Sequence, residues 1–140
     1  MKMLKQSKSM LKEGQKKQII GLFESFSAIK LGYFFGSRAQ GNFGPTSDYD
    51  FAVYLDQTPE KESFKVKANL IAQISLILKT DAIDVVLLNH KIPDELAYNI
   101  IVTGELIHQI EPYKLLVEPA ILNRFFDYRL SLQKNKLTKA

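Results

Sequence analysis

Two short apolar runs, separated by a segment of small and turn-forming residues, place the strongest limit on how this chain can fold. Residues 31–35 and 51–55 are both too short for a buried helix and are typical of buried strands. Residues 36–47 between them are rich in glycine and serine, which predicts a loop with at most one or two helical turns. We therefore expect a strand, a turn and a second strand near the middle of the fold.

The apolar residues elsewhere predict helices and two further strands. Helices are expected over about residues 10–28, 58–79, 93–102 and 113–132, and strands over residues 82–88 and 106–108. In the second helix we expect Thr58 as N-cap, Pro59 at the first helical position and a core stripe of Phe64, Ala68, Ile71, Ala72, Ser75 and Leu78. This order predicts an α/β (α+β) fold, a small mixed sheet flanked by helices, in a single domain over residues 1–140.

The composition excludes several classes of protein. The 140 residues are 46% apolar and include no cysteine, so neither disulfides nor thiolate metal ligands are available. No run approaches the roughly 18 apolar residues of a membrane span, and the start lacks the apolar stretch of a signal peptide. We therefore expect a cytoplasmic protein with no membrane association.

The net charge of +4 conceals an acidic body between two basic ends. Residues 1–17 carry six Lys and one Glu, and residues 128–140 carry four basic residues and no acidic one. Residues 18–127 hold nine basic and fourteen acidic residues. Basic ends are more often solvated helix termini than nucleic-acid surfaces, so we expect helical ends and no direct nucleic-acid substrate.

The turn after the first predicted strand could hold a phosphate. Gly36 lets the backbone approach a ligand closely, and Ser37 supplies a hydroxyl and a backbone N–H at the start of a helical turn. The alternative is an ordinary turn that ends a strand.

Asp48 and Asp50 lie at the start of the second strand. Residues two apart in a strand point to the same face, so the two carboxylates are expected side by side, with Tyr49 facing away. Adjacent carboxylates repel each other, and Mg²⁺ held together with substrate phosphates would remove that repulsion. The alternative is a local turn in which Ser47 and Asp48 cap the strand and Asp50 is solvated.

Asp84 interrupts the third predicted strand, which is otherwise apolar. An unpaired buried carboxylate is costly, so Asp84 is expected to need a partner. A neighbouring strand that brought it beside Asp48 and Asp50 would create a three-carboxylate site for two metal ions, as suits in-line phosphoryl or nucleotidyl transfer. Asp81 is the weaker candidate for the third ligand.

Three segments in this order resemble a known family: residues 35–41, residues 47–53 and residues 83–86. They are similar to the minimal nucleotidyltransferases of the DNA polymerase beta superfamily, specifically the MntA-type MNT antitoxins that are paired with HEPN toxins. The resemblance covers about residues 20–110. It implies the polymerase beta-like nucleotidyltransferase fold.

The resemblance also implies roles for individual residues. Gly36 and Ser37 would bind the triphosphate of ATP, and Asp48, Asp50 and Asp84 would bind two Mg²⁺ ions and act in catalysis. Arg38 is a further candidate ATP ligand, or else a surface arginine beside the loop. Gln40 departs from the family, which often has a second arginine there.

The activity implied by the resemblance is Mg²⁺-dependent transfer of AMP from ATP to a hydroxyl of a protein, with pyrophosphate leaving. For MNT antitoxins the acceptor is typically a tyrosine of the cognate HEPN ribonuclease, so we expect a hetero-oligomer with that toxin. Two alternatives stay open: transfer to a small molecule such as an aminoglycoside, and a non-catalytic antitoxin that neutralises its toxin by forming a complex.

Overall fold

A four-stranded mixed sheet forms the centre of the protein. The computed structural model describes residues 11–42, 44 and 46–139. The strands are β1 (Ile29–Phe35), β2 (Tyr49–Leu55), β3 (Ile83–Leu87) and β4 (Glu105–Gln109), and their order across the sheet is β3-β2-β1-β4. β1 is antiparallel to β2 and β4, whereas β2 and β3 are parallel. The predicted mixed sheet flanked by helices is confirmed.

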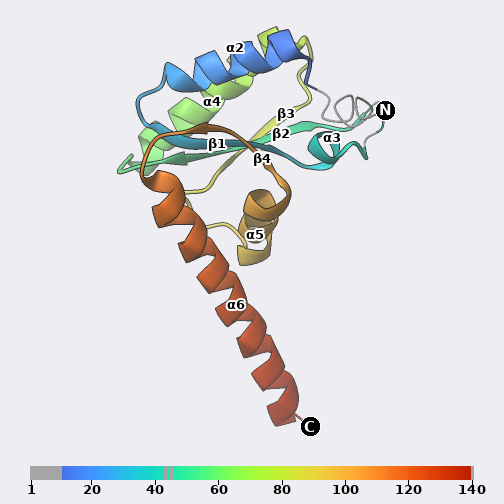
Figure 1. Cartoon of the computed structure of the whole chain (residues 1–140), viewed down its shortest axis with the longest axis vertical. Helices are drawn as coiled ribbons and strands as arrows, with labels where there is room; N and C mark the ends of the chain where they lie inside the picture. The colour runs from blue at the N-terminus through green and yellow to red at the C-terminus, as the bar shows by residue number, and fades with distance from the viewer. Residues whose placement is uncertain (1–10, 43, 45, 140) are drawn as a thin grey trace.

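Helices cover both faces of this sheet (Figure 1). α2 (Glu13–Glu24) and α4 (Glu60–Leu78) lie on one face, and α5 (Asp94–Thr103) and α6 (Tyr113–Lys139) lie on the other. The short α3 (Ser37–Gln40) follows β1 directly. Each face has its own apolar cluster, one centred on Phe23, Phe51 and Ile74 and the other on Tyr33, Ala52 and Ile100.

The predicted start of α4 is wrong by one residue. Pro59 is the N-cap and Glu60 the first helical residue. The Thr58 hydroxyl donates instead to the carbonyl of Asp56, at 3.0 Å. Thr58 therefore closes the turn after β2 and does not cap the helix.

The predicted core stripe of α4 is only partly right: Leu78 is buried and Ile71 packs against the core, but the other predicted positions differ. Phe64 is 49% exposed, and Ala68 and Ala72 are exposed as well. The buried residues are Ser63, Leu70, Ile74 and Leu78. Ser63 tolerates burial because its hydroxyl donates to the Thr58 carbonyl and accepts from the Asn89 side-chain amide, both at 3.4 Å.

The two ends of the chain differ in how much of them is described. Residues 1–10, which include most of the predicted basic N-terminal end, lie outside the described residues. At the other end α6 runs seven residues past its predicted end at residue 132 and includes most of the basic segment. None of the described helices is long and apolar enough to cross a membrane.

A substitution at Gly32 in β1 would test how tightly α2 packs on the sheet. A Cβ atom at Gly32 would lie 2.5 Å from Cδ2 of Phe23, whereas a Cβ at Gly21 in α2 would meet nothing within 4 Å. We expect Gly32→Ala to lower the free energy of unfolding by about 1–3 kcal/mol because the core is overpacked. Gly21→Ala, the matched control, should raise it by about 0.5–1 kcal/mol. Urea denaturation of both variants measures this, and equal effects would contradict the packing described.

Candidate active site

The parallel pairing of β2 with β3 brings the predicted carboxylates together. Asp50 and Asp84 are Cα partners in the register of the two strands, and Asp48 directly precedes β2. Alternate strand residues share a face, so Asp48 and Asp50 lie on the same face as Ala52. Ala52 packs in the cluster beneath α5 and α6. The three aspartates therefore lie on the α5/α6 face, at the end of the sheet where β2 and β3 begin.

Asp50 is the carboxyl group most affected by this arrangement. Burial, together with the negative charges of Asp84 and Asp48, raises its pKa from 3.8 to about 6. The three groups therefore interact electrostatically in the folded protein. A cation near them would remove the repulsion.

The predicted burial of Asp84 is wrong. β3 lies at the edge of the sheet, and Asp84 is exposed on it between the buried residues Ile83 and Val85. Its carboxylate can be hydrated and does not require a partner on grounds of burial. Its position opposite Asp50 is what brings it into the site.

Gly36 is in close contact with Asp50. Its φ is +86°, a conformation that L side chains rarely adopt. A Cβ atom here would lie 2.3 Å from Oδ2 of Asp50 and 3.2 Å from its Cβ. Only glycine fits between the end of β1 and the carboxylate, so the Gly36-Ser37 turn lies directly beside the aspartates.

Arg38 holds the segment that precedes β2. Its Nε donates to the carbonyl of Ser47 at 2.9 Å, and its guanidinium lies 4.2 Å from the ring centroid of Tyr49. Tyr49 faces away from the aspartates, as predicted, and stacks on Phe34. Arg38 thus links α3 to the start of β2, and this places the Gly36-Ser37 turn relative to Asp48.

No preformed metal-ion site is found among the described residues. Among them, no group of three or more His, Cys, Asp or Glu side chains is arranged so that it could hold a metal ion. What the structure brings together is Gly36, Asp48, Asp50 and Asp84, at the start of two neighbouring strands.

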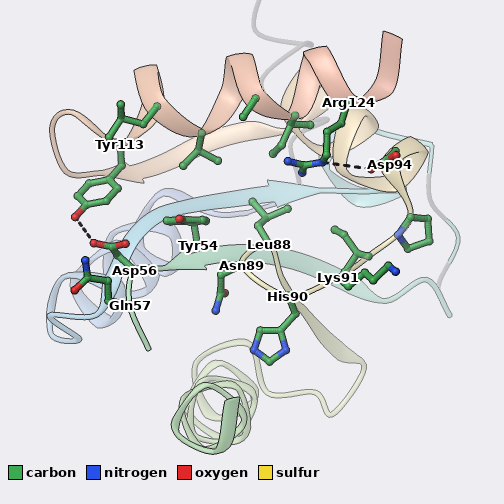
Figure 2. A pocket seen from close by; sticks show the side chains of 16 residues that line it. Tyr54, Asp56, Gln57, Leu88, Asn89, His90, Lys91, Asp94, Tyr113 and Arg124 are labelled. Carbon is green, nitrogen blue, oxygen red and sulfur yellow. Dashed lines mark hydrogen bonds and ion pairs between the residues drawn. The ribbon is translucent and has the colours of Figure 1, made fainter. Parts of the chain in front are cut away.

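A groove of about 980 Å³ lies on the same face but near the opposite end of β2 (Figure 2). Tyr54 and Leu88 line its floor on the sheet side, and α6 borders it with Val117 and Ile121. Tyr54 is four residues from Asp50, about 13 Å along an extended strand. The groove is therefore separate from the aspartates.

Two polar contacts link α6 to the body at this groove. The Tyr113 hydroxyl donates to Asp56 at 2.5 Å, and Nε of Arg124 lies 3.5 Å from Oδ1 of Asp94. The hydrogen bond to Asp56 raises the pKa of Tyr113. The sequence gives no sign of this groove because its walls come from three segments far apart in the chain, and no local motif marks them.

The sequence matches the family "Polymerase beta, Nucleotidyltransferase" over residues 17–112. The chain belongs to this nucleotidyltransferase family. The matched residues include Gly36, Ser37 and all three aspartates, and they end directly before α6.

A relative by sequence is the protein adenylyltransferase MntA of Aphanizomenon flos-aquae (strain 2012/KM1/D3). It is 37% identical over 70 residues. The aligned segment is 44% of this chain and 45% of that protein, so it spans less than half of the relative's length.

Two solved structures have the same fold as this nucleotidyltransferase. One is a toxin-antitoxin with AMP-PNP, at 21% identity and a TM-score of 0.70 over 89% of this chain and 98% of the other. The second is a tri-AMPylated Shewanella oneidensis HEPN toxin in complex with an MNT antitoxin, at 18% identity and a TM-score of 0.66 over 91% and 98% of the two chains.

Replacing Asp50 with Asn should stabilise the protein at neutral pH. Because the pKa of Asp50 is raised, the folded protein binds the Asp50 proton more tightly than the unfolded chain does. This proton binding adds fully to the free energy of unfolding below pH 3.8, and the contribution is lost as the pH rises through 6. Allowing for solvent screening of a half-buried carboxyl, we expect Asp50→Asn to add about 1 kcal/mol at pH 8 and little at pH 4. Urea denaturation in EDTA at both pH values measures this.

Asp81→Asn is the matched control, because Asp81 is an exposed carboxylate just before β3. It should change stability by less than about 0.5 kcal/mol at either pH. A destabilised Asp50→Asn at pH 8 would contradict the electrostatic account of the site.

Proposed function

We propose that this nucleotidyltransferase is a Mg²⁺-dependent protein adenylyltransferase. It transfers AMP from ATP to a tyrosine hydroxyl of a cognate HEPN ribonuclease toxin and so acts as an antitoxin. The observation that carries this proposal is the placement of Asp48, Asp50 and Asp84 beside the Gly36-Ser37 turn, within a nucleotidyltransferase fold. The similarity to the protein adenylyltransferase MntA supports a protein as acceptor.

The donor chemistry at this place fits magnesium. Asp48, Asp50 and Asp84 offer hard carboxylate oxygens, and burial together with the charges of its two neighbours raises the pKa of Asp50 to about 6. We assign the three aspartates as the ligands of two Mg²⁺ ions. When bound, these ions would neutralise phosphate charge and lower the pKa of the acceptor hydroxyl.

The residues of the chain itself bind and orient the substrates. The backbone N–H and hydroxyl of Ser37 bind the triphosphate, and Gly36 leaves room for it beside Asp50. Arg38 keeps the turn and the start of β2 in place through Ser47 and Tyr49, and its own contact with ATP stays a prediction.

The reaction joins the acceptor oxygen to the α-phosphorus of ATP and breaks the bond between that phosphorus and the bridging oxygen of pyrophosphate. The carboxylate of Asp84 is exposed and therefore accessible to an acceptor, and it takes the proton of the attacking hydroxyl. Most of the catalysis is positioning and charge, which a chain of this size can supply.

The solved toxin-antitoxin structures support the choice of partner. One contains an MNT antitoxin with an AMPylated HEPN toxin, and another contains AMP-PNP. We extend both properties to this chain: a HEPN toxin as acceptor and partner, and ATP as the nucleotide. A single catalytic domain and a cytoplasmic location are further parts of the proposal.

The test is transfer of label from ATP to the purified cognate HEPN toxin in the presence of Mg²⁺. Label from the α-phosphate should appear on the toxin, and label from the γ-phosphate should not. We expect Asp48→Ala with Asp50→Ala to lower the rate by about 10³-fold or more, because the charge that binds the metal is lost.

Asp81→Ala is the matched control and should transfer AMP at the wild-type rate. Transfer of the γ label would indicate a kinase and overturn the proposal. Undiminished transfer by the double variant would exclude the aspartates as the catalytic site.

A further inference from the structure

Asp48 is the one aspartate of the three that lies outside the strand ladders. It directly precedes β2, and pairing with β3 begins one residue later, where Tyr49 is opposite Ile83. Asp48 is exposed, and no hydrogen bond or ion pair to its carboxylate is found in the described part of the chain. The position of this carboxylate therefore depends on what holds the residues on either side of Asp48.

Arg38 contacts both of these neighbours. Its Nε donates to the carbonyl of Ser47 at 2.9 Å, and its guanidinium lies 4.2 Å from the centroid of the Tyr49 ring. A guanidinium over an aromatic ring is attracted by it, and more strongly where water is partly excluded. Arg38 and Tyr49 are both half-buried. One side chain thus fixes the backbone immediately before and immediately after Asp48.

The ring of Tyr49 is itself anchored in the core. It stacks on Phe34, with the ring centroids 6.5 Å apart, and Phe34 lies 5.2 Å from Phe51. Both phenylalanines are fully buried. Tyr49 makes these contacts with its ring, and no hydrogen bond of its hydroxyl is found among the described residues. The ring therefore links Arg38 to the apolar cluster beneath α2 and α4.

Tyr49 and the carboxylates lie on opposite sides of β2. Tyr49 packs against the cluster on the α2/α4 face, whereas alternation along the strand turns Asp48 and Asp50 to the α5/α6 face. The guanidinium of Arg38 lies beside the Tyr49 ring, on the α2/α4 side. In the proposed reaction the metal ions and the triphosphate bind on the aspartate side. Arg38 can therefore act on the reaction without touching ATP.

We propose that Tyr49 is a positioning residue for Asp48, and that Arg38 acts on AMP transfer through Tyr49 and Ser47. The inference rests on the proposed function for the metal-binding role of Asp48. Without the Tyr49 ring, the Asp48 carboxylate is no longer held where the metal binds. The affinity for Mg²⁺ and the rate of transfer fall together, while the KM for ATP at saturating Mg²⁺ changes little.

A direct contact between Arg38 and ATP would give a different pattern. Arg38→Gln would then raise the KM for ATP and leave the Mg²⁺ requirement unchanged, and its effect would add to that of Tyr49→Leu. Residues that act through one another instead show non-additive effects. The double variant therefore separates the two roles of Arg38.

The test compares Tyr49→Leu, Tyr49→Phe, Arg38→Gln and the double variant Arg38→Gln with Tyr49→Leu. Tyr54→Leu is the matched control, because Tyr54 is a half-buried tyrosine of the same strand whose ring contacts Tyr113, far from the aspartates. AMP transfer to the purified cognate toxin gives the kcat, the KM for ATP and the Mg²⁺ concentration for half-maximal rate. All rates are measured well below the melting midpoint of every variant.

We expect Tyr49→Leu and Arg38→Gln each to lower kcat by about tenfold and to raise the Mg²⁺ concentration for half-maximal rate by about threefold or more. The double variant should lie within about twofold of the weaker single variant. Tyr49→Phe keeps the ring and should restore the wild-type values, and Tyr54→Leu should stay within about twofold of wild type.

Three results would overturn the inference. The first is a wild-type rate and Mg²⁺ requirement in Tyr49→Leu. The second is a double variant whose loss is the product of the two single losses, because Arg38 would then act independently of Tyr49. The third is an equal loss in Tyr54→Leu, which would show that lower stability of β2 is the cause.

A metal-binding measurement separates this inference from the proposed function. Mn²⁺ affinity of the protein alone is measured by electron paramagnetic resonance, with Asp48→Ala to identify the site. If wild type binds Mn²⁺ through Asp48 but transfers no AMP, the adenylyltransferase proposal is wrong, and the positioning role stands only if Tyr49→Leu weakens Mn²⁺ binding. If wild type transfers AMP and Tyr49→Leu binds Mn²⁺ and transfers AMP equally well, the positioning role is wrong and the activity is supported.

Discussion

The pairing of β2 with its two neighbours is the constraint on which the site depends. Parallel pairing with β3 places Asp84 opposite Asp50, and antiparallel pairing with β1 places Phe35, and so Gly36, beside Asp50. A shift of β3 by one residue would turn Asp84 to the other face, toward α4. The repulsion among the carboxylates opposes folding, and the apolar clusters on both faces hold the strands in register.

Much of this arrangement could be predicted from the sequence because its signals are local. The apolar runs define the strands, and alternation along a strand places Asp48 and Asp50 on one face and Tyr49 on the other. Gly36 marks a turn where a side chain would not fit, and the structure supplies the reason, which is contact with the Asp50 carboxylate. Asp84 is predicted to join the site if a neighbouring strand brings it beside Asp48 and Asp50, and the parallel pairing of β2 with β3 does so.

The rest depends on contacts between distant segments. Burial of Ser63 in place of Phe64 depends on the amide of Asn89, 26 residues away, so helical spacing alone misplaces the stripe of α4. The exposure of Asp84 follows from the strand order, which leaves β3 at the edge. The groove beneath α6 becomes visible only when the body against which α6 packs is known.

The central claim is that three aspartates beside a glycine-serine turn bind the metal ions and the phosphates of ATP. Crystals grown with Mn²⁺ and a non-hydrolysable ATP analogue test it most directly, because manganese is located by anomalous scattering. The account predicts two manganese peaks among Asp48, Asp50 and Asp84, with the triphosphate on the backbone of Ser37. Manganese and nucleotide bound elsewhere, for example in the groove beneath α6, would contradict it.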